Sequence, residues 1–214
     1  MAATRIKICG ISTLDTLEAV IEARADYVGL NFYPPSPRHI AMAQAVELAQ
    51  LSQGRIQRVG VFVDADDTLL ADAVAAGRLD AIQLHGTESP QRAAQLRNRF
   101  GLPVWKVLSV ASATDISRAA DYAGVADFIL FDAKTPKDAV LPGGMGLHFD
   151  WTLLNTYRGT LPWGLAGGLT PDNVGDAIRH TGAPLVDTSS GVENAPGIKD
   201  VDKIAAFCKA ARQS

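Results

Sequence analysis

The sequence is poor in the features that mark secreted or membrane proteins. It contains two cysteines in 214 residues, Cys9 and Cys208, at opposite ends of the chain. Because structural disulfides are rare in cytosolic proteins, we expect both to be free thiols. No apolar run is long enough to cross a bilayer, and residues 1–5 lack the apolar stretch of a signal peptide. These absences predict a cytoplasmic protein with no membrane partner.

The chain also lacks an excess of charge. Its 20 lysines and arginines nearly balance 23 aspartates and glutamates, for a formal net charge of -3. This balance gives no long-range attraction for nucleic acid, so any positive charge that matters must be local, which favours a small anionic ligand. The four histidines show no zinc-like spacing, and the glycine loops match neither a Walker nor a dinucleotide motif. We expect neither a metal nor another cofactor.

Short aliphatic runs alternate with amphipathic stretches, as in βα units around a parallel sheet. With 47% apolar and 20% charged residues, the composition is that of one globular domain, residues 1–214. We expect strands at residues 5–9, 27–32, 58–63, 81–84, 104–108, 128–131, 163–166 and 185–187. We expect helices at residues 13–23, 41–51, 66–76, 89–100, 113–122, 171–180 and 200–212.

The sixth βα unit is irregular. A long loop separates Phe131 from Asp150, and only residues 149–157 are able to form a short helix there. Long loops in compact domains are usually functional. An open doubly wound sheet would show the same alternation, but phosphate-type loops after units seven and eight favour a closed barrel. The predicted fold is therefore α/β, a (β/α)8 TIM barrel with a closed, parallel, eight-stranded sheet.

The first phosphate-type loop follows the seventh predicted strand. Gly167 and Gly168 let the backbone approach a ligand without a Cβ in the way. Thr170 is a good N-cap and Pro171 suits the first helical position, so we expect a helix N-terminus to face the same spot. The alternative is that the glycines serve only a tight turn.

The second such loop follows the eighth strand. Ser189, Ser190 and Gly191 offer hydroxyl and N–H groups one unit after the first loop. Paired loops at this place in (β/α)8 barrels commonly bind phosphate. We therefore predict a phosphate site formed by both loops.

Two residues at strand ends could exchange protons with a ligand. Cys9 ends the first strand before Gly10, where a thiolate could act as a base or nucleophile. Asp132 follows four apolar residues, which favour its neutral acid form. Each has an ordinary alternative: Cys9 as a small core residue, and Asp132 as a turn cap or a partner of Lys134. If both face the barrel mouth, they form a base and acid pair.

Other strand-end residues could bind a ligand. Arg38 lies on a proline-stiffened loop and suits a carboxylate, although most loop arginines are simply solvated. His85 ends the fourth strand and is a candidate to line the site, and Asp187 ends the eighth. The remaining histidines, His39, His148 and His180, are expected to be surface or capping residues.

Several motifs, in order, resemble those of the phosphoribosylanthranilate isomerase family. They lie at residues 7–10 (KICG), 36–38 (SPR), 59–63 (VGVFV), 83–86 (QLHG), 131–132 (FD), 143–146 (GGMG), 149–151 (FDW), 166–169 (AGGL) and 187–193 (DTSSGVE). The likeness extends from Lys7 to Asp200. One departure is Met145, where the family usually has threonine, so we expect that loop to contribute through its glycine backbone.

The resemblance implies an Amadori rearrangement in tryptophan biosynthesis with no cofactor, in a monomer or homodimer. It implies that Asp132 is the general acid that opens the ribose ring and Cys9 the general base at C2. Arg38 would hold the anthranilate carboxylate, and Asp187 would hydrogen-bond the substrate. The implied phosphate ligands are Gly167, Gly168, Ser189, Ser190 and Gly191.

Three alternatives stay open at this point. A ribulose-phosphate epimerase would need a metal or paired acids, and an indole-glycerol-phosphate synthase would need a catalytic lysine and glutamate. Lys106 in the fifth strand keeps the synthase possible. A silent phospho-ligand binding protein is the third, but binding phosphate needs none of Cys9, Asp132 and Arg38.

Overall fold

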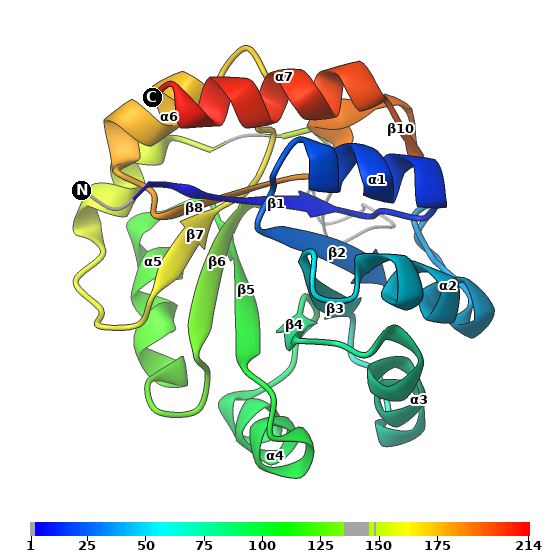
Figure 1. Cartoon of the computed structure of the whole chain (residues 1–214). Helices are drawn as coiled ribbons and strands as arrows, with labels where there is room; N and C mark the ends of the chain where they lie inside the picture. Colours follow the sequence, from blue (N-terminus) through cyan, green and yellow to red (C-terminus); the bar gives the residue numbers. More distant parts are fainter. Residues whose placement is uncertain (1–2, 135–145, 148) are drawn as a thin grey trace.

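The computed structural model describes residues 3–134, 146–147 and 149–214. Within this part of the chain, eight parallel strands close into a barrel (Figure 1). Closure is made by β1 against β8, where Lys7 is in register with Asp187. The strands are β1 (Arg5–Cys9), β2 (Tyr27–Asn31), β3 (Gln57–Phe62), β4 (Ala81–Leu84), β5 (Val104–Val110), β6 (Phe128–Ala133), β7 (Trp163–Leu165) and β8 (Leu185–Thr188). The predicted closed parallel sheet is confirmed.

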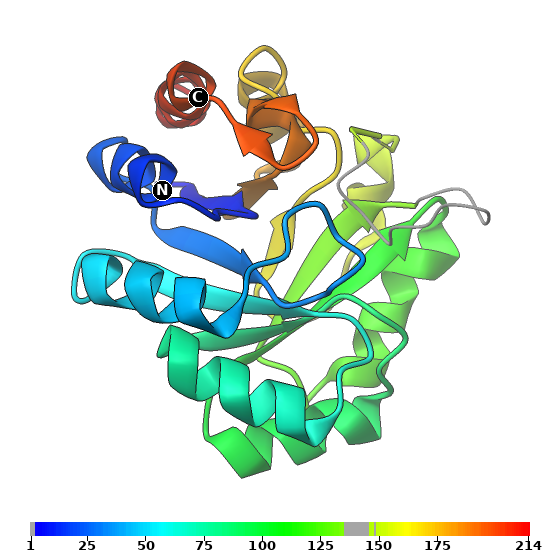
Figure 2. The same ribbon diagram turned by 90° about the vertical axis from the view of Figure 1, so that its right-hand side faces the viewer.

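Helices lie around the outside of the barrel (Figure 2). They are α1 (Leu14–Glu22), α2 (Met42–Ser52), α3 (Asp67–Gly77), α4 (Pro90–Phe100), α5 (Ala113–Ser117), α6 (Val174–Thr181) and α7 (Val201–Arg212). Four, α1, α3, α4 and α7, begin at side-chain caps: Thr13 accepts from Thr16 N, Asp66 from Leu69 N, Ser89 from Arg92 N and Asp200 from Lys203 N. None of the helices in the described ranges has the length and apolarity of a membrane span.

Two of the expected helices differ in the structure. The fifth splits into α5 and a 3-10 helix, η1 (Arg118–Tyr122). The sixth, expected at residues 171–180, is α6 and begins at Val174, so the prediction of Thr170 as N-cap and Pro171 as the first helical residue is wrong. Residues 171–173 form a turn instead, in which the Asn173 side chain accepts from Thr170 N and donates to Gly168 O. The short helix of the sixth unit is a 3-10 helix, η2 (Trp151–Thr156).

After β8 the chain adds a 3-10 helix, η3 (Ser190–Val192), and a hairpin of β9 (Glu193–Ala195) and β10 (Ile198–Lys199). The sequence patterns do not indicate this hairpin because its strands are only three and two residues long. It packs against the loop after β2, where a Cβ on Gly197 would lie 2.4 Å from Pro37 O. The hairpin thereby brings Glu193 and Lys199 next to Arg38.

The barrel interior is filled at the end where the strands begin. Tyr27 and Trp105 pack edge to face with centroids 5.1 Å apart, and Trp105 lies 4.6 Å from Phe128. All three are buried, together with aliphatic residues of the same interior cluster. Since aromatic side chains fill this end, space for a ligand remains at the carboxyl ends of the strands.

Candidate active site

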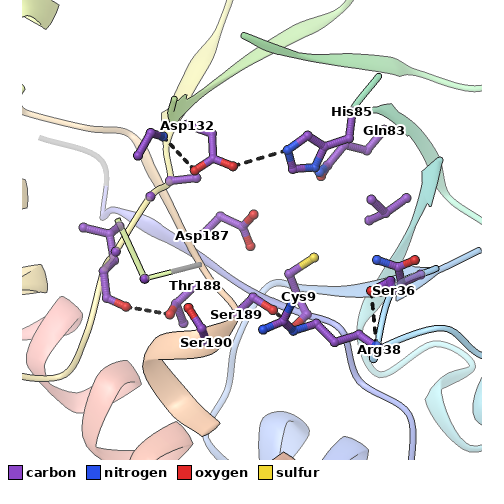
Figure 3. Close-up of a pocket in the computed structure, with 18 of the residues that line it drawn as sticks. Cys9, Ser36, Arg38, Gln83, His85, Asp132, Asp187, Thr188, Ser189 and Ser190 are labelled. Atoms are coloured by element: carbon purple, nitrogen blue, oxygen red, sulfur yellow. Dashed lines mark hydrogen bonds and ion pairs between the residues drawn. The ribbon is translucent and has the colours of Figure 1, made fainter. Parts of the chain in front are cut away.

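A pocket opens at the carboxyl ends of the barrel strands (Figure 3). It encloses about 820 Å³, its open mouth included. Nine of the ten predicted site residues line it: Cys9, Arg38, His85, Asp132, Gly167, Gly168, Asp187, Ser189 and Ser190. The tenth, Gly191, lies behind the lining, where a Cβ would be 1.9 Å from Leu169 O. Gly191 thus allows the two glycine loops to approach each other.

Cys9 lies at the end of β1 with its thiol in the pocket, so it is not a sealed core residue. A Cβ on the neighbouring Gly29 would be 2.7 Å from Cys9 Sγ, so that glycine makes room for the thiol. Burial raises the pKa of the Cys9 thiol, while the Lys7 ammonium opposes this rise. In the unliganded site the protonated thiol is therefore the favoured form at neutral pH.

Lys7 is a charged residue beneath the pocket that the sequence patterns did not single out. It is fully buried, and its Nζ donates to both carboxylate oxygens of Asp187 at 3.1 Å. Burial lowers the pKa of Lys7, but Asp187 and Cys9 together hold it above its ordinary value. A cation therefore lies beneath the site, two residues before Cys9 and on the same face of β1. That two-residue spacing is the signal that could have identified it.

Asp132 is buried at the carboxyl end of β6. Its Oδ1 accepts from Ala133 N at 2.8 Å. Its Oδ2 lies 3.3 Å from His85 Nε2, within ion-pair distance, although the two atoms are not aligned for a hydrogen bond. The alternative that Asp132 pairs with Lys134 is wrong, because Lys134 Nζ lies 3.9 Å from an oxygen of Asp115. Figure 3 shows Asp132 and Cys9 on separate walls of the pocket.

The side chain of Arg38 is held by Glu193, which lies on β9 and not on the loop of Arg38. Its Nε and Nη2 each donate at 2.8 Å to one oxygen of Glu193, a planar paired contact. Lys199 Nζ also donates to Glu193 at 2.6 Å. Burial raises the pKa of Glu193, but the two cations bring it below its ordinary value, so the carboxylate is charged. Arg38 is thus a buried, oriented side chain and not a solvated one.

The loop after β7 requires glycine. Gly167 has φ +89° and Gly168 φ +62°, the left-handed region that side chains disfavour. A Cβ on Gly168 would lie 2.7 Å from Leu147 O. The loop after β8 is tied to its surroundings by two hydroxyls, since Thr188 Oγ1 donates to Leu169 O and Ser189 Oγ to Cys9 O. Both loops border one side of the pocket, as a phosphate site would require.

Comparison with known proteins decides the family. The model of the family described as N-(5'phosphoribosyl)anthranilate (PRA) isomerase matches residues 6–210. The chain belongs to this family. It is 55% identical over 207 residues to the PRA isomerase of Paramagnetospirillum magneticum, covering 97% of this chain and 96% of that protein. The resemblance seen in the sequence motifs is confirmed, and the chain is an isomerase.

Solved structures of PRA isomerases share the fold. The structure from Thermotoga maritima has a TM-score of 0.86 and 36% identity, covering 99% of this chain and 100% of that chain. Another, with a TM-score of 0.83 and 34% identity over the same shares, is a PRA isomerase in complex with reduced 1-(o-carboxyphenylamino)-1-deoxyribulose 5-phosphate. The TIM-barrel prediction is confirmed by these neighbours as well as by the sheet itself.

Other candidate residues do not join the site. Lys106 is buried away from the pocket, where it donates to Glu88 at 2.8 Å and to Gly86 O at 2.7 Å, so the synthase alternative loses its lysine. His180 contacts the backbone of Asp176 on α6. Among the described residues, no group of three or more His, Cys, Asp or Glu side chains could hold a metal ion. Met145 and His148 lie outside the described residues.

Proposed function

We propose that the chain converts N-(5′-phosphoribosyl)anthranilate to 1-(2-carboxyphenylamino)-1-deoxyribulose 5-phosphate, an Amadori rearrangement in tryptophan biosynthesis. The observation that carries this proposal is one pocket that holds a thiol, a carboxyl group, an oriented arginine and two glycine loops. The related PRA isomerase that was solved with a reduced carboxyphenylamino deoxyribulose phosphate supports it. Family membership and site chemistry thus favour the same reaction.

Ring opening is assigned to Asp132. As a carboxylic acid it protonates the ribose ring oxygen, the C1–O bond breaks, and the anilino nitrogen lone pair forms the C1–N double bond. The products are a hydroxyl at C4 and an iminium. Asp132 is buried at the end of β6, and the Ala133 N–H fixes one oxygen so that the other faces the pocket.

Proton abstraction is assigned to Cys9. As a thiolate it removes the C2 hydrogen, whose electrons form the C1–C2 double bond and neutralise the iminium. The enolamine then tautomerises to the C2 ketone. The positive charges of Lys7 and the iminium both favour the thiolate, and they offset the burial that raises the pKa of Cys9.

The two ends of the substrate are assigned to opposite sides of the pocket. The phosphate lies against Gly167, Gly168, Ser189 and Ser190, and the adjacent Gly191 lets these loops meet. The carboxylate lies at Arg38, beside the apolar Val61 and Val63 that suit an aryl ring. Asp187, held by Lys7, hydrogen-bonds the sugar. We expect a monomer or a homodimer.

The direct test is turnover of phosphoribosylanthranilate, generated in situ because it is labile. Loss of its anthranilate-type fluorescence on adding purified protein is the expected result. A protein that binds the substrate or a product analogue without turnover would instead be the silent binding protein considered above.

Activity is expected to survive dialysis against EDTA. No cluster of metal-binding side chains lines the described part of the pocket, so the proposed proton transfers need only the chain's own residues. The assay is repeated after dialysis, with untreated enzyme as control. Loss of turnover that zinc or magnesium restores would contradict the proposed mechanism and favour the epimerase.

Arg38→Ala is expected to raise KM more than it lowers kcat. The arginine grips a carboxylate that takes no part in bond breaking, so its contact is present in both ground and transition states. A charged hydrogen-bonded pair contributes about 1.5–3 kcal/mol, which predicts a KM increase of roughly 10–150-fold. Arg38→Lys is the matched control: it keeps the charge but loses the planar double contact with Glu193, so it should recover KM only in part. An unchanged KM in Arg38→Ala would remove this residue from the carboxylate site.

A further inference from the structure

The side chain of Gln83 is a polar group in the pocket to which the proposed reaction gives no role. It lies on β4, is only 1% exposed, and lines the pocket two residues before His85 (Figure 3). Its Oε1 is buried and has no hydrogen-bond partner in the described part of the chain. A buried amide oxygen without a donor is costly, so a native structure that keeps one calls for an explanation, and a catalytic role is one such explanation.

The neighbouring polar side chains are already engaged. Asn31 Oδ1 accepts from Tyr33 N, and Ser36 Oγ accepts from Arg38 N. Among the buried side-chain nitrogen and oxygen atoms without a partner in the described ranges, those that line the pocket are Gln83 Oε1 and His85 Nε2. The histidine nitrogen has Asp132 at 3.3 Å. The amide oxygen of Gln83 is therefore a buried acceptor beside the pocket that no described group of the protein satisfies.

The position of Gln83 indicates which part of the substrate it meets. Gln83 is in register with Val61 of β3. Val61 and Val63 form the apolar wall of the pocket beside Arg38. Two residues along β4, on the same face, His85 reaches toward Asp132. Gln83 thus lies between the wall assigned to the carboxyphenyl ring and the acid assigned to the sugar. The atom that joins the ring to the sugar is the anilino nitrogen.

We propose that Gln83 Oε1 accepts a hydrogen bond from the anilino N–H and stabilises the iminium formed on ring opening. This inference rests on the proposed function. No proton is transferred to the amide: the N–H stays on nitrogen while nitrogen gains positive charge, so a neutral hydrogen bond becomes a charge-assisted one. A fixed dipole directed at a developing charge lowers the barrier without reorganisation. Gln83 is then a catalytic residue, and it acts before the thiolate removes the C2 hydrogen.

The experiment uses Gln83→Met, which keeps the side-chain length and removes the amide. Gln57→Met is the matched control, because Gln57 begins β3 at the opposite end of the barrel and does not line the pocket. Three quantities are measured for each protein: kcat/KM, the Kd of reduced 1-(o-carboxyphenylamino)-1-deoxyribulose 5-phosphate, and Tm. This analogue keeps the anilino N–H and cannot form the iminium.

We expect Gln83→Met to lower kcat/KM by about 10–150-fold and to weaken the analogue by about 2–10-fold, because charge-assisted hydrogen bonds contribute more than neutral ones. Its Tm should not fall, since the amide oxygen has no partner to lose in the free protein. Equal losses in rate and analogue affinity, or an unchanged rate, would overturn iminium stabilisation. If Gln83→Met does not fold, its partnerless amide has a structural role and the inference is also overturned.

Gln83→Glu provides a second comparison, because it keeps an acceptor oxygen at the same length. It should retain more of kcat/KM than Gln83→Met, and the reverse order would contradict the inference. The turnover of the wild-type enzyme is measured on its own, because it tests the proposed function and not the role of Gln83. An inactive wild type would contradict the proposed function itself, whereas an active wild type with an equally active Gln83→Met contradicts only the role of Gln83.

Discussion

Cys9→Ala is expected to lower kcat by roughly 10²–10⁴-fold or more, the range that proton-transfer groups contribute, while a product analogue still binds. The small methyl group leaves the pocket open and removes the group proposed to take the C2 hydrogen. Cys9→Ser should also be poor, because a hydroxyl is far less acidic than a thiol. The iminium should still form in these variants, so the block is expected after ring opening.

The pH dependence follows from the surroundings of Cys9. Burial raises the pKa of this thiol, so the free enzyme holds it protonated at neutral pH. Since the thiolate is the proposed base, kcat/KM should rise with pH as the thiol ionises, and this limb should disappear in Cys9→Ala. Charged groups around the thiol are Lys7 beneath it, Asp187 on β8, Lys199 on β10 and Arg38 after β2.

Cys208→Ala is the matched control for this experiment. Cys208 is buried on α7, and burial raises its pKa to about 11, so it should neither ionise near neutral pH nor affect the kcat profile.

With a C2-deuterated substrate, wild-type enzyme should transfer the label to C1 or exchange it with solvent. Near wild-type kcat in Cys9→Ala would show that another group is the base.

Asp132→Asn is expected to lower kcat by a similar factor of roughly 10²–10⁴. The carboxamide keeps the side-chain volume and can still accept from Ala133 N, so the fold of β6 should be retained. It cannot protonate the ring oxygen as a carboxylic acid does. The substrate should therefore stay closed, and the variant should not wash deuterium out of C2.

The two variants differ in which step they block, and this difference is the sharper test. Asp176→Asn, an exposed carboxylate on α6 that pairs with Arg179, is the matched control and should have the wild-type rate. If Asp132→Asn still exchanged the C2 label, ring opening would not depend on this acid and the division of roles would fail.

The proposed mechanism does not require Cys9 and Asp132 together to gain or lose a proton when the substrate binds. A protonated thiol with a charged carboxylate contains the same number of protons as a thiolate with a carboxylic acid, so substrate binding need not change the total. The iminium and Lys7 favour the thiolate of the second distribution. The site is therefore expected to reach its reactive form only with the substrate in place.

Much of the barrel could be predicted because its signals are local. Alternating strand and helix patterns depend on residues a few positions apart, and all eight predicted strands overlap the observed ones. The prediction of Thr170 as a helix N-cap was wrong, and the reason is also local. The backbone N–H of Thr170 is taken by the side chain of Asn173, so a turn forms before α6 begins.

Cys9, Asp132 and Arg38 could be selected from the sequence because each stands at or after the carboxyl end of a strand, where barrel sites form. The residues that contact them in the fold could not be predicted from the sequence. Lys7 binds a residue 180 positions away, and Arg38 binds Glu193 at a separation of 155. Neither pairing has a periodic signature.

By itself, the sequence determined the order of elements, the residue types at the strand ends and the two glycine loops, because backbone propensity and hydrophobic period act over a few residues. Only the tertiary structure decided which charges meet. Closure of β1 on β8 places Lys7 under Cys9 and Asp187, and the β9–β10 hairpin brings Glu193 to Arg38. Contacts of this kind exist only once the barrel has closed and water has left its interior, where charges interact more strongly than they do in water.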